Sequence, residues 1–167
     1  MAHTSNTTLL EALLDSWDRN NVILLNLLGA IPEGGLDARA SSGSPTVGEM
    51  FAHIHYVRLV FVLEDAPDFA KKMPEKEWDA EWNLAQMQEM LRESSAAVRA
   101  AVRKKVEAGE EMKEHYDHPI LFLQHMIWHE GYHHGQIKLA LKLAGHPIPD
   151  DMAGPLTWDI WMNKTKM

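Results

Sequence analysis

The hydrophobic positions of this chain recur every three or four residues over four long segments, which is the spacing of amphipathic helices. The first segment covers residues 7–28 and is followed by Gly29, a residue type that often ends helices. Residues 31–45 are rich in Gly, Pro and Ser and predict a connecting loop. Thr46 and Glu49 then have the spacing of a capping box, which predicts the start of a second helix. Its apolar face is expected to contain Val47, Met50, His53 or Ile54, Val57 and Phe61.

The second half of the chain predicts two more helices and a compact tail. Residues 65–82 have mixed polarity and two prolines, so they form either a short helix or a loop. A third helix is expected over residues 83–108 and a fourth over residues 120–144, with Asp117 as the N-terminal cap of the fourth. The aromatic and aliphatic residues of the tail, Trp158, Ile160 and Trp161, are expected to pack back onto these helices. Since no segment alternates as a strand does, the pattern predicts an all-α four-helix bundle with a packed C-terminal tail, in one domain over residues 1–167.

Composition narrows the function classes. The 167 residues carry a formal charge of −8, which disfavours nucleic-acid binding because phosphate backbones are also negative. There is no cysteine, so disulfides, thiolate zinc sites and cysteine nucleophiles are excluded. No apolar run approaches the ~20 residues of a membrane span, and the N-terminus has no signal-peptide pattern. These features favour a cytoplasmic protein without membrane or nucleic-acid partners.

Ten histidines are the feature that a helical core alone does not explain. His125, His129 and His133 are four residues apart within the predicted fourth helix. Each step of four residues drifts by only about 40° around a helix, so the three share one stripe. Two imidazoles at this spacing can direct nitrogens at one ion. The pair His129 and His133 therefore indicates half of a metal site.

A third ligand must come from another element, and His53 on the predicted second helix is the best candidate. Three ligands from two helices leave positions on the ion for water or substrate, as in catalytic sites. His125 could be a fourth ligand, an outer partner of the ligands or a pocket wall. Glu49, one turn before His53, could complete a closed structural site or orient that imidazole. The remaining histidines are expected to face away from the ion or to lie on the surface: His3, His55, His115, His118, His134 and His146.

The segment His129-Glu130-Gly131-Tyr132-His133 also matches H-E-x-x-H, the zinc metallopeptidase motif in which the Glu is the general base. Its context does not fit that class. Gln136 and Leu139 stand where the extended motif needs Gly and His, no Glu follows Glu130, and no strand accompanies the helix. Metallopeptidase activity is therefore the less favoured interpretation.

Two segments together, TVGEMFAHI and HMIWHEGYHHGQI, resemble the DinB/YfiT-like superfamily, and the similarity in helix order covers most of the chain. The resemblance implies a four-helix bundle with a divalent metal, zinc or nickel, held by His53, His129 and His133. Gly135 matches the family pattern, and we expect it to allow close approach of a neighbouring helix. His134 stands where many members have Arg.

The resemblance also implies a homodimer and a metal-dependent enzyme, such as a thiol-dependent S-transferase that uses a low-molecular-weight thiol and a small electrophilic substrate. A metal-dependent hydrolase, or a non-catalytic stress-response or binding module with a structural metal, are the alternatives. His125, Glu130 and Tyr56 are candidates for the catalytic pocket. Trp128 and Tyr132 could also line it, but packing is the favoured role of these two aromatics.

Overall fold

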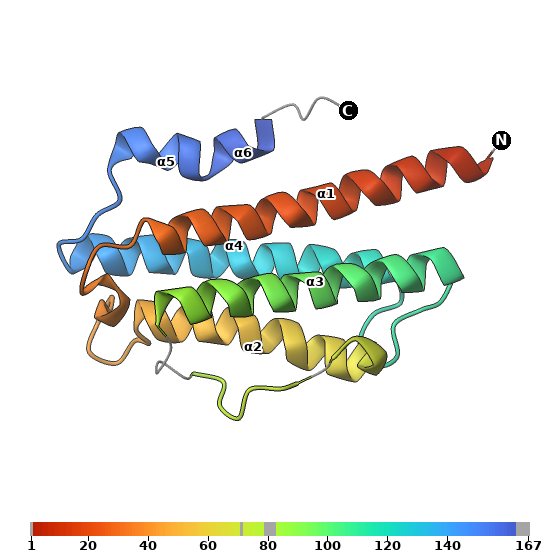
Figure 1. The fold of residues 1–167 in the computed structure, drawn as a ribbon, viewed down its shortest axis with the longest axis horizontal. Coiled ribbons are helices and arrows are strands. Elements are labelled where there is room, and N and C mark those ends of the chain that lie inside the picture. The colour runs from red at the N-terminus through yellow and green to blue at the C-terminus, as the bar shows by residue number, and fades with distance from the viewer. Residues whose placement is uncertain (1, 71, 79–82, 163–167) are drawn as a thin grey trace.

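The computed structural model describes residues 2–70, 72–78 and 83–162, and within these ranges it is a bundle of long helices without strands (Figure 1). The elements in chain order are α1 (Ala2–Gly29), the 3-10 turn η1 (Gly35–Asp37), α2 (Val47–Asp65), the 3-10 turn η2 (Pro67–Phe69), α3 (Leu84–Ala108), α4 (Pro119–Leu143), α5 (Asp150–Leu156) and α6 (Trp158–Met162). The predicted all-α fold is confirmed. The undecided segment before α3 contains η2, and its residues 71 and 79–82 lie outside the described part of the chain.

The ends of α2 and α3 follow from local side-chain chemistry. At α2, the Thr46 side chain accepts a hydrogen bond from Glu49 N at 3.0 Å, and Thr46 N donates to Glu49 Oε2 at 2.6 Å. This is the predicted capping box, and it satisfies two backbone donors that a helix start otherwise leaves unpaired. At the end of α3, Gly109 has a φ of 67°, a left-handed conformation that glycine adopts without steric cost.

The cap of α4 differs from the prediction. His118, not Asp117, is the N-terminal cap, because its backbone is extended (φ −147°, ψ 137°) and its Nδ1 accepts from Ile120 N at 3.1 Å. Pro119 follows at the first helical position, where its missing N–H costs nothing. His118 is exposed, as predicted, and its side chain additionally caps α4.

The interior of the bundle has three levels. Two clusters of buried apolar side chains occupy its two ends, one around Leu24, Ile54 and Ile137 and the other around Trp17 and Phe122. Between them lies a level of buried polar groups, which we call the polar layer: Asn20, Asn21, His55, Arg58, Ser94, Ser95, Glu130 and His133. Polar groups at this depth are retained only where hydrogen bonds offset their desolvation.

Arg58 and Glu130 form the centre of the polar layer, with side chains that are 0% and 1% exposed. Arg58 donates to the two carboxylate oxygens at 2.6 and 2.8 Å, and its guanidinium lies 4.8 Å from the centre of the Trp17 ring. Asn20 Nδ2 also donates to Glu130, at 2.5 Å, and Arg58 donates to Asn21 Oδ1 at 2.9 Å. The ion pair is thus fully hydrogen-bonded and joins α2 to α4.

The C-terminal tail lies against α1, as the sequence predicts, but Trp158 and Trp161 are themselves 54% and 42% exposed. Asn26 Nδ2 donates to Leu156 O at 3.2 Å, and the Arg19 guanidinium donates to Ile160 O. Figure 1 shows α5 and α6 lying along α1 on the outside of the bundle. Among the described residues, no helix combines the length and apolar character required to cross a membrane.

Candidate metal centre

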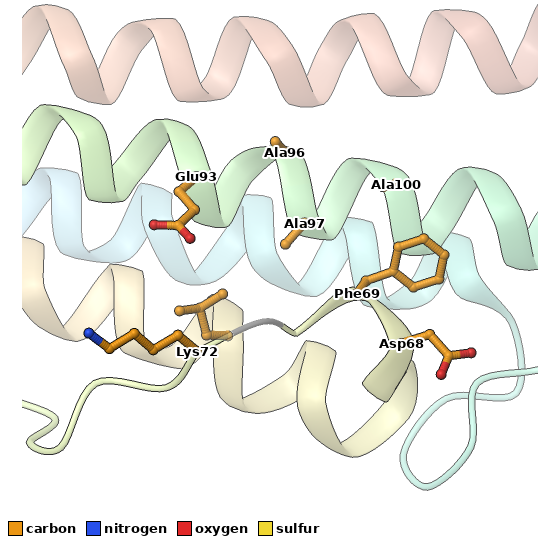
Figure 2. A pocket seen from close by; sticks show the side chains of 8 residues that line it. Asp68, Phe69, Lys72, Glu93, Ala96, Ala97 and Ala100 are labelled. Carbon is orange, nitrogen blue, oxygen red and sulfur yellow. The ribbon is translucent and has the colours of Figure 1, made fainter.

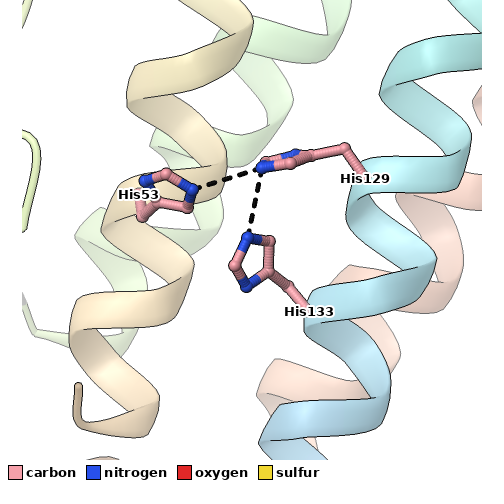
Figure 3. A group of neighbouring side chains, drawn as sticks. All are labelled: His53, His129 and His133. Atoms are coloured by element: carbon pink, nitrogen blue, oxygen red, sulfur yellow. Dashed lines mark hydrogen bonds between the residues drawn. The ribbon is translucent and has the colours of Figure 1, made fainter. Parts of the chain in front are cut away.

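Three imidazoles converge at the level of the polar layer, between α2 and α4 (Figure 3). His53 comes from α2, and His129 and His133 come from successive turns of α4. The Nε2 atom of His129 lies 3.2 Å from Nε2 of His53 and 3.1 Å from Nε2 of His133. The three residues that the sequence predicts as ligands are therefore brought together, each with the same ring nitrogen inward.

The spacing of these nitrogens fits a small divalent ion. A tetrahedral ion with metal–nitrogen bonds of about 2.0–2.1 Å holds its nitrogens about 3.3–3.4 Å apart. The two separations from His129 Nε2, 3.1 and 3.2 Å, are close to that value, and all three ligand atoms lie within 4.8 Å of one another. Three imidazole nitrogens suit zinc and nickel among the common divalent ions.

The histidines are also held in the protonation state that binds metal. Burial, together with the neighbouring His133 and His53, lowers the pKa of His129 to about 3. Burial lowers the pKa of His133 to about 4 and also lowers that of His53. At neutral pH all three rings are therefore neutral and have a lone pair available, as a metal ligand requires.

Two residues from the segment before α3 contact His53, and sequence reasoning missed both. The Glu77 carboxylate lies 2.8 Å from His53 Nδ1, and the Trp78 ring is stacked on the imidazole at 4.1 Å between centroids. The pair Glu77–His53 has the distance of an ion pair rather than the full geometry of a hydrogen bond. No local pattern in residues 72–78 indicated these contacts, because they depend on how this segment passes over α2.

Glu49 does not take the role beside His53 that its spacing suggested. Its carboxylate accepts from Thr46 N and lies 3.5 Å from the Arg39 guanidinium, at the start of α2. Capping α2 and contacting Arg39 direct this carboxylate away from the imidazole one turn later. Glu77 occupies the position next to His53 instead.

His125 and Tyr56 are near the centre but outside the converging set. His125 Nδ1 lies 2.8 Å from the Tyr116 hydroxyl, and its ring contacts Phe61 edge-on at 5.6 Å. His125 is still close enough to His129 to contribute to the lowering of its pKa. This favours a supporting position rather than a fourth ligand. Tyr56 is partly buried on α2, three residues after His53.

Glu130, the residue of the peptidase-like motif, is turned into the bundle. Both of its oxygens accept hydrogen bonds in the polar layer, from Arg58 and Asn20, and the side chain is 1% exposed. A carboxylate paired in this way lacks the free, water-facing position of a general base. The geometry therefore agrees with setting the metallopeptidase interpretation aside.

Trp128 and Tyr132, for which packing in the core or in a dimer contact is expected, do not lie in the core of the single chain. They are 71% and 56% exposed and stack on each other at 6.4 Å, while the Tyr132 ring meets the edge of His133 at 5.2 Å. His129 therefore points inward from α4, whereas Trp128 and Tyr132 point outward. These two aromatic side chains lie on the side of α4 that no other described helix covers. Together with Trp78, they place aromatic surface next to the histidines.

Two of the other histidines contact groups outside the centre. His55 faces away from the centre as expected, is buried, and bonds through Nδ1 with Met90 O at 2.8 Å. His115 lies on the surface as expected, and its Nδ1 is 3.0 Å from the fully buried Asp65 carboxylate. The side chain of His3 lies outside the described part of the structure.

Gly135 does not serve close packing as the family pattern suggested. A Cβ atom placed there would meet no atom within 4 Å, so the position is open.

A cavity of about 270 Å³ lies between α2, α3 and η2 (Figure 2), lined by Leu59, Asp68, Phe69, Lys72, Glu93, Ala96, Ala97 and Ala100. It includes none of the three converging histidines and is separate from the candidate metal centre.

Comparison with known protein families gives a match over nearly the whole chain. A model of the DinB family matches residues 1–164. No curated protein and no solved structure gives a significant match.

Proposed function

Because it belongs to the DinB family, we propose that this protein uses His53, His129 and His133 to hold a divalent transition-metal ion, zinc or nickel, for catalysis. The observation that carries the proposal is the convergence of three neutral imidazole nitrogens from two helices. Burying three such nitrogens costs free energy unless they bind a ligand, because their inward lone pairs lose contact with water.

The proposed reaction class is transfer of an electrophilic group to a low-molecular-weight thiol. A divalent ion with three protein ligands has open positions, and when bound it would lower the pKa of a thiol or a water so that a nucleophile exists near neutral pH. The sulfur would form a bond to the electrophilic carbon as the leaving group departs with its electron pair. The exposed rings of Trp78 and Tyr132 suit an uncharged, partly apolar electrophile beside the ion.

Two other functions use the same ion. In a metal-dependent hydrolase, water would replace the thiol; Glu130 would not be its base, because that carboxylate is paired with Arg58 in the core. In a non-catalytic module, the ion would stabilise the bundle without turnover. Activity that requires both a thiol and an electrophile would distinguish the thiol transferase from the hydrolase and from the non-catalytic module.

Metal analysis of the purified protein tests the ligand set first. We expect one equivalent of metal in the wild type and in His134→Ala, and loss of stoichiometric metal in His53→Ala and His133→Ala. His134 is the matched control because it adjoins His133 on α4 but is outside the converging set. If the two ligand variants retain one equivalent of metal, the proposed centre is wrong.

A screen of thiols with electrophilic substrates tests the reaction. We expect thiol consumption that depends on added metal and is lost in His133→Ala. Thiol-independent ester or amide hydrolysis would favour the hydrolase, and metal binding without turnover would favour the module.

For assembly we propose a homodimer through α4. Five exposed apolar side chains lie within an arc of about 60° on this helix. This exposed stripe consists of Leu121, Trp128, Tyr132, Leu139 and Leu143. Leu121 and Leu143 are equidistant from Tyr132, so a twofold axis near Tyr132 would bring each Leu121 against Leu143 of the other copy. Apolar stripes of this length on one helix are typical of interfaces.

A further inference from the structure

His53 differs from the other two proposed ligands in how its ring is held. His129 and His133 are one turn apart on α4 and contact each other edge to face at 4.5 Å. His53 is the single ligand from α2, so its orientation needs support from outside its own helix. Its side chain is 11% exposed, which shows that something covers it although it lies at the edge of the bundle.

Glu77 and Trp78 supply that cover. Glu77 Oε1 lies 2.8 Å from Nδ1, the ring nitrogen that points away from the converging set. The Trp78 ring is parallel to the imidazole within 2° at 4.1 Å, which is van der Waals contact over one whole face. Two consecutive residues therefore fix both the edge and the face of one imidazole.

The chemistry of the contact selects one tautomer. An ionised carboxylate accepts hydrogen bonds and donates none, so Glu77 Oε1 at 2.8 Å favours the tautomer of His53 that carries its hydrogen on Nδ1. The lone pair of neutral His53 is then on Nε2, the atom that lies 3.2 Å from His129 Nε2. A carboxylate on the outer nitrogen also makes the inner nitrogen a stronger ligand, and removing such partners typically weakens metal binding.

The other two ligands have no carboxylate at this position. Among the described residues, Nδ1 of all three proposed ligands is buried without a full hydrogen bond, and His53 is the one whose Nδ1 has a carboxylate within ion-pair distance. Among the described residues, Glu77 is therefore the carboxylate in ion-pair contact with a proposed ligand. It comes from the segment between α2 and α3.

We propose that Glu77 and Trp78 are positioning residues of the metal centre, with Glu77 setting the tautomer of His53 and Trp78 holding its ring plane. This inference rests on the proposed metal site. It assigns the segment over residues 72–78 to the metal centre and makes Trp78 a reporter of metal binding.

Metal affinity measured by competition with a chelator tests the role of Glu77. We expect Glu77→Ala to weaken zinc binding by roughly 10–100-fold, and Glu77→Gln to recover part of the loss because its amide oxygen still accepts from Nδ1. Glu75→Ala is the matched control, since this acidic side chain is exposed in the same segment. Equal affinities of Glu77→Ala and Glu75→Ala would overturn the proposal.

Two spectroscopic readouts separate positioning from a general effect on stability. In the metal-free protein, ¹⁵N spectra of the histidines should show the Nδ1–H tautomer of His53 in the wild type and a shift towards Nε2–H in Glu77→Ala. Nickel should quench tryptophan fluorescence in the wild type, and much less in Trp78→Phe, which keeps a stacked ring. An unchanged tautomer or undiminished quenching would contradict the proposal.

The outcomes also separate this inference from the proposed function. If the wild type binds no metal, the proposed function fails, while the tautomer in the metal-free protein still decides the role of Glu77. If the wild type binds one equivalent and Glu77→Ala binds it equally well, only the further inference fails.

Discussion

Arg58 and Glu130 face each other across the centre of the bundle and bind through two hydrogen bonds of 2.6 and 2.8 Å. Arg58 is five residues after His53 on α2, and Glu130 directly follows His129 on α4. The ion pair therefore connects the same two helices that carry the proposed ligands, at the same level. It fixes their relative position from the inside, while the histidines meet at the outer side.

Loss of Glu130 should destabilise the fold strongly. We expect Glu130→Gln to lower the free energy of unfolding by about 3–5 kcal/mol, because it leaves the Arg58 charge buried without its partner. Denaturant unfolding measures this. The double variant Arg58→Met/Glu130→Leu should lose less than the sum of the single variants, since neither charge then remains. A loss below about 1 kcal/mol in Glu130→Gln would contradict the prediction.

The metal-free protein should lose stability in mild acid. The pKa values of His129 and His133 are lowered from 6.5 to about 3 and about 4, so the unfolded chain binds protons that the folded chain excludes. The free energy of unfolding should have its full value above pH 6.5 and should fall steadily as the pH decreases towards 4. Chemical denaturation at a series of pH values measures it. His129→Ala should show a shallower decline, and an identical decline would count against these lowered pKa values.

Removal of the cap of α2 should have a modest and local effect. We expect Thr46→Ala to cost about 1 kcal/mol, because Glu49 N loses the Thr46 hydroxyl oxygen to which it donates. Thr46→Ser keeps the acceptor and serves as the control, with a smaller loss. Thermal unfolding of the two variants measures the difference. Equal melting temperatures would show that the capping box contributes nothing to stability.

Disruption of the exposed stripe on α4 should dissociate the proposed dimer. We expect Leu139→Glu to shift the protein to a monomer, since it places a charge at the apolar interface without disturbing the core. Leu63→Glu is the control, because Leu63 is 42% exposed on α2 and does not belong to the stripe. Sedimentation velocity gives the masses. A wild type that is monomeric at tens of micromolar would show that α4 does not mediate self-association.

The helices could be predicted from the sequence because their signals are local. The apolar periodicity and the Thr46–Glu49 capping box each act within one or two turns, and the structure confirms them. The same holds for His129 and His133, whose spacing of four residues places them on one stripe in any regular helix. Their role as a pair could therefore be proposed before the fold was known.

Other decisions depended on how the helices pack. The sequence left open whether His53 or Ile54 points inward; in the bundle Ile54 is fully buried and His53 lies at the edge facing α4. The cap of α4 moved from Asp117 to His118 because backbone conformation, not residue type alone, selects it. Each of these depended on angles that periodicity does not determine.

The sequence by itself determined the helical segments, the all-α class and the two ligands that share α4, because these follow from interactions over a few residues. Only the tertiary structure decided that Glu77 and Trp78 cover His53, that Arg58 pairs with Glu130, and that Trp128 is exposed. These contacts join segments far apart in the chain. Their free energy comes from burial and pairing that exist only after the helices have packed.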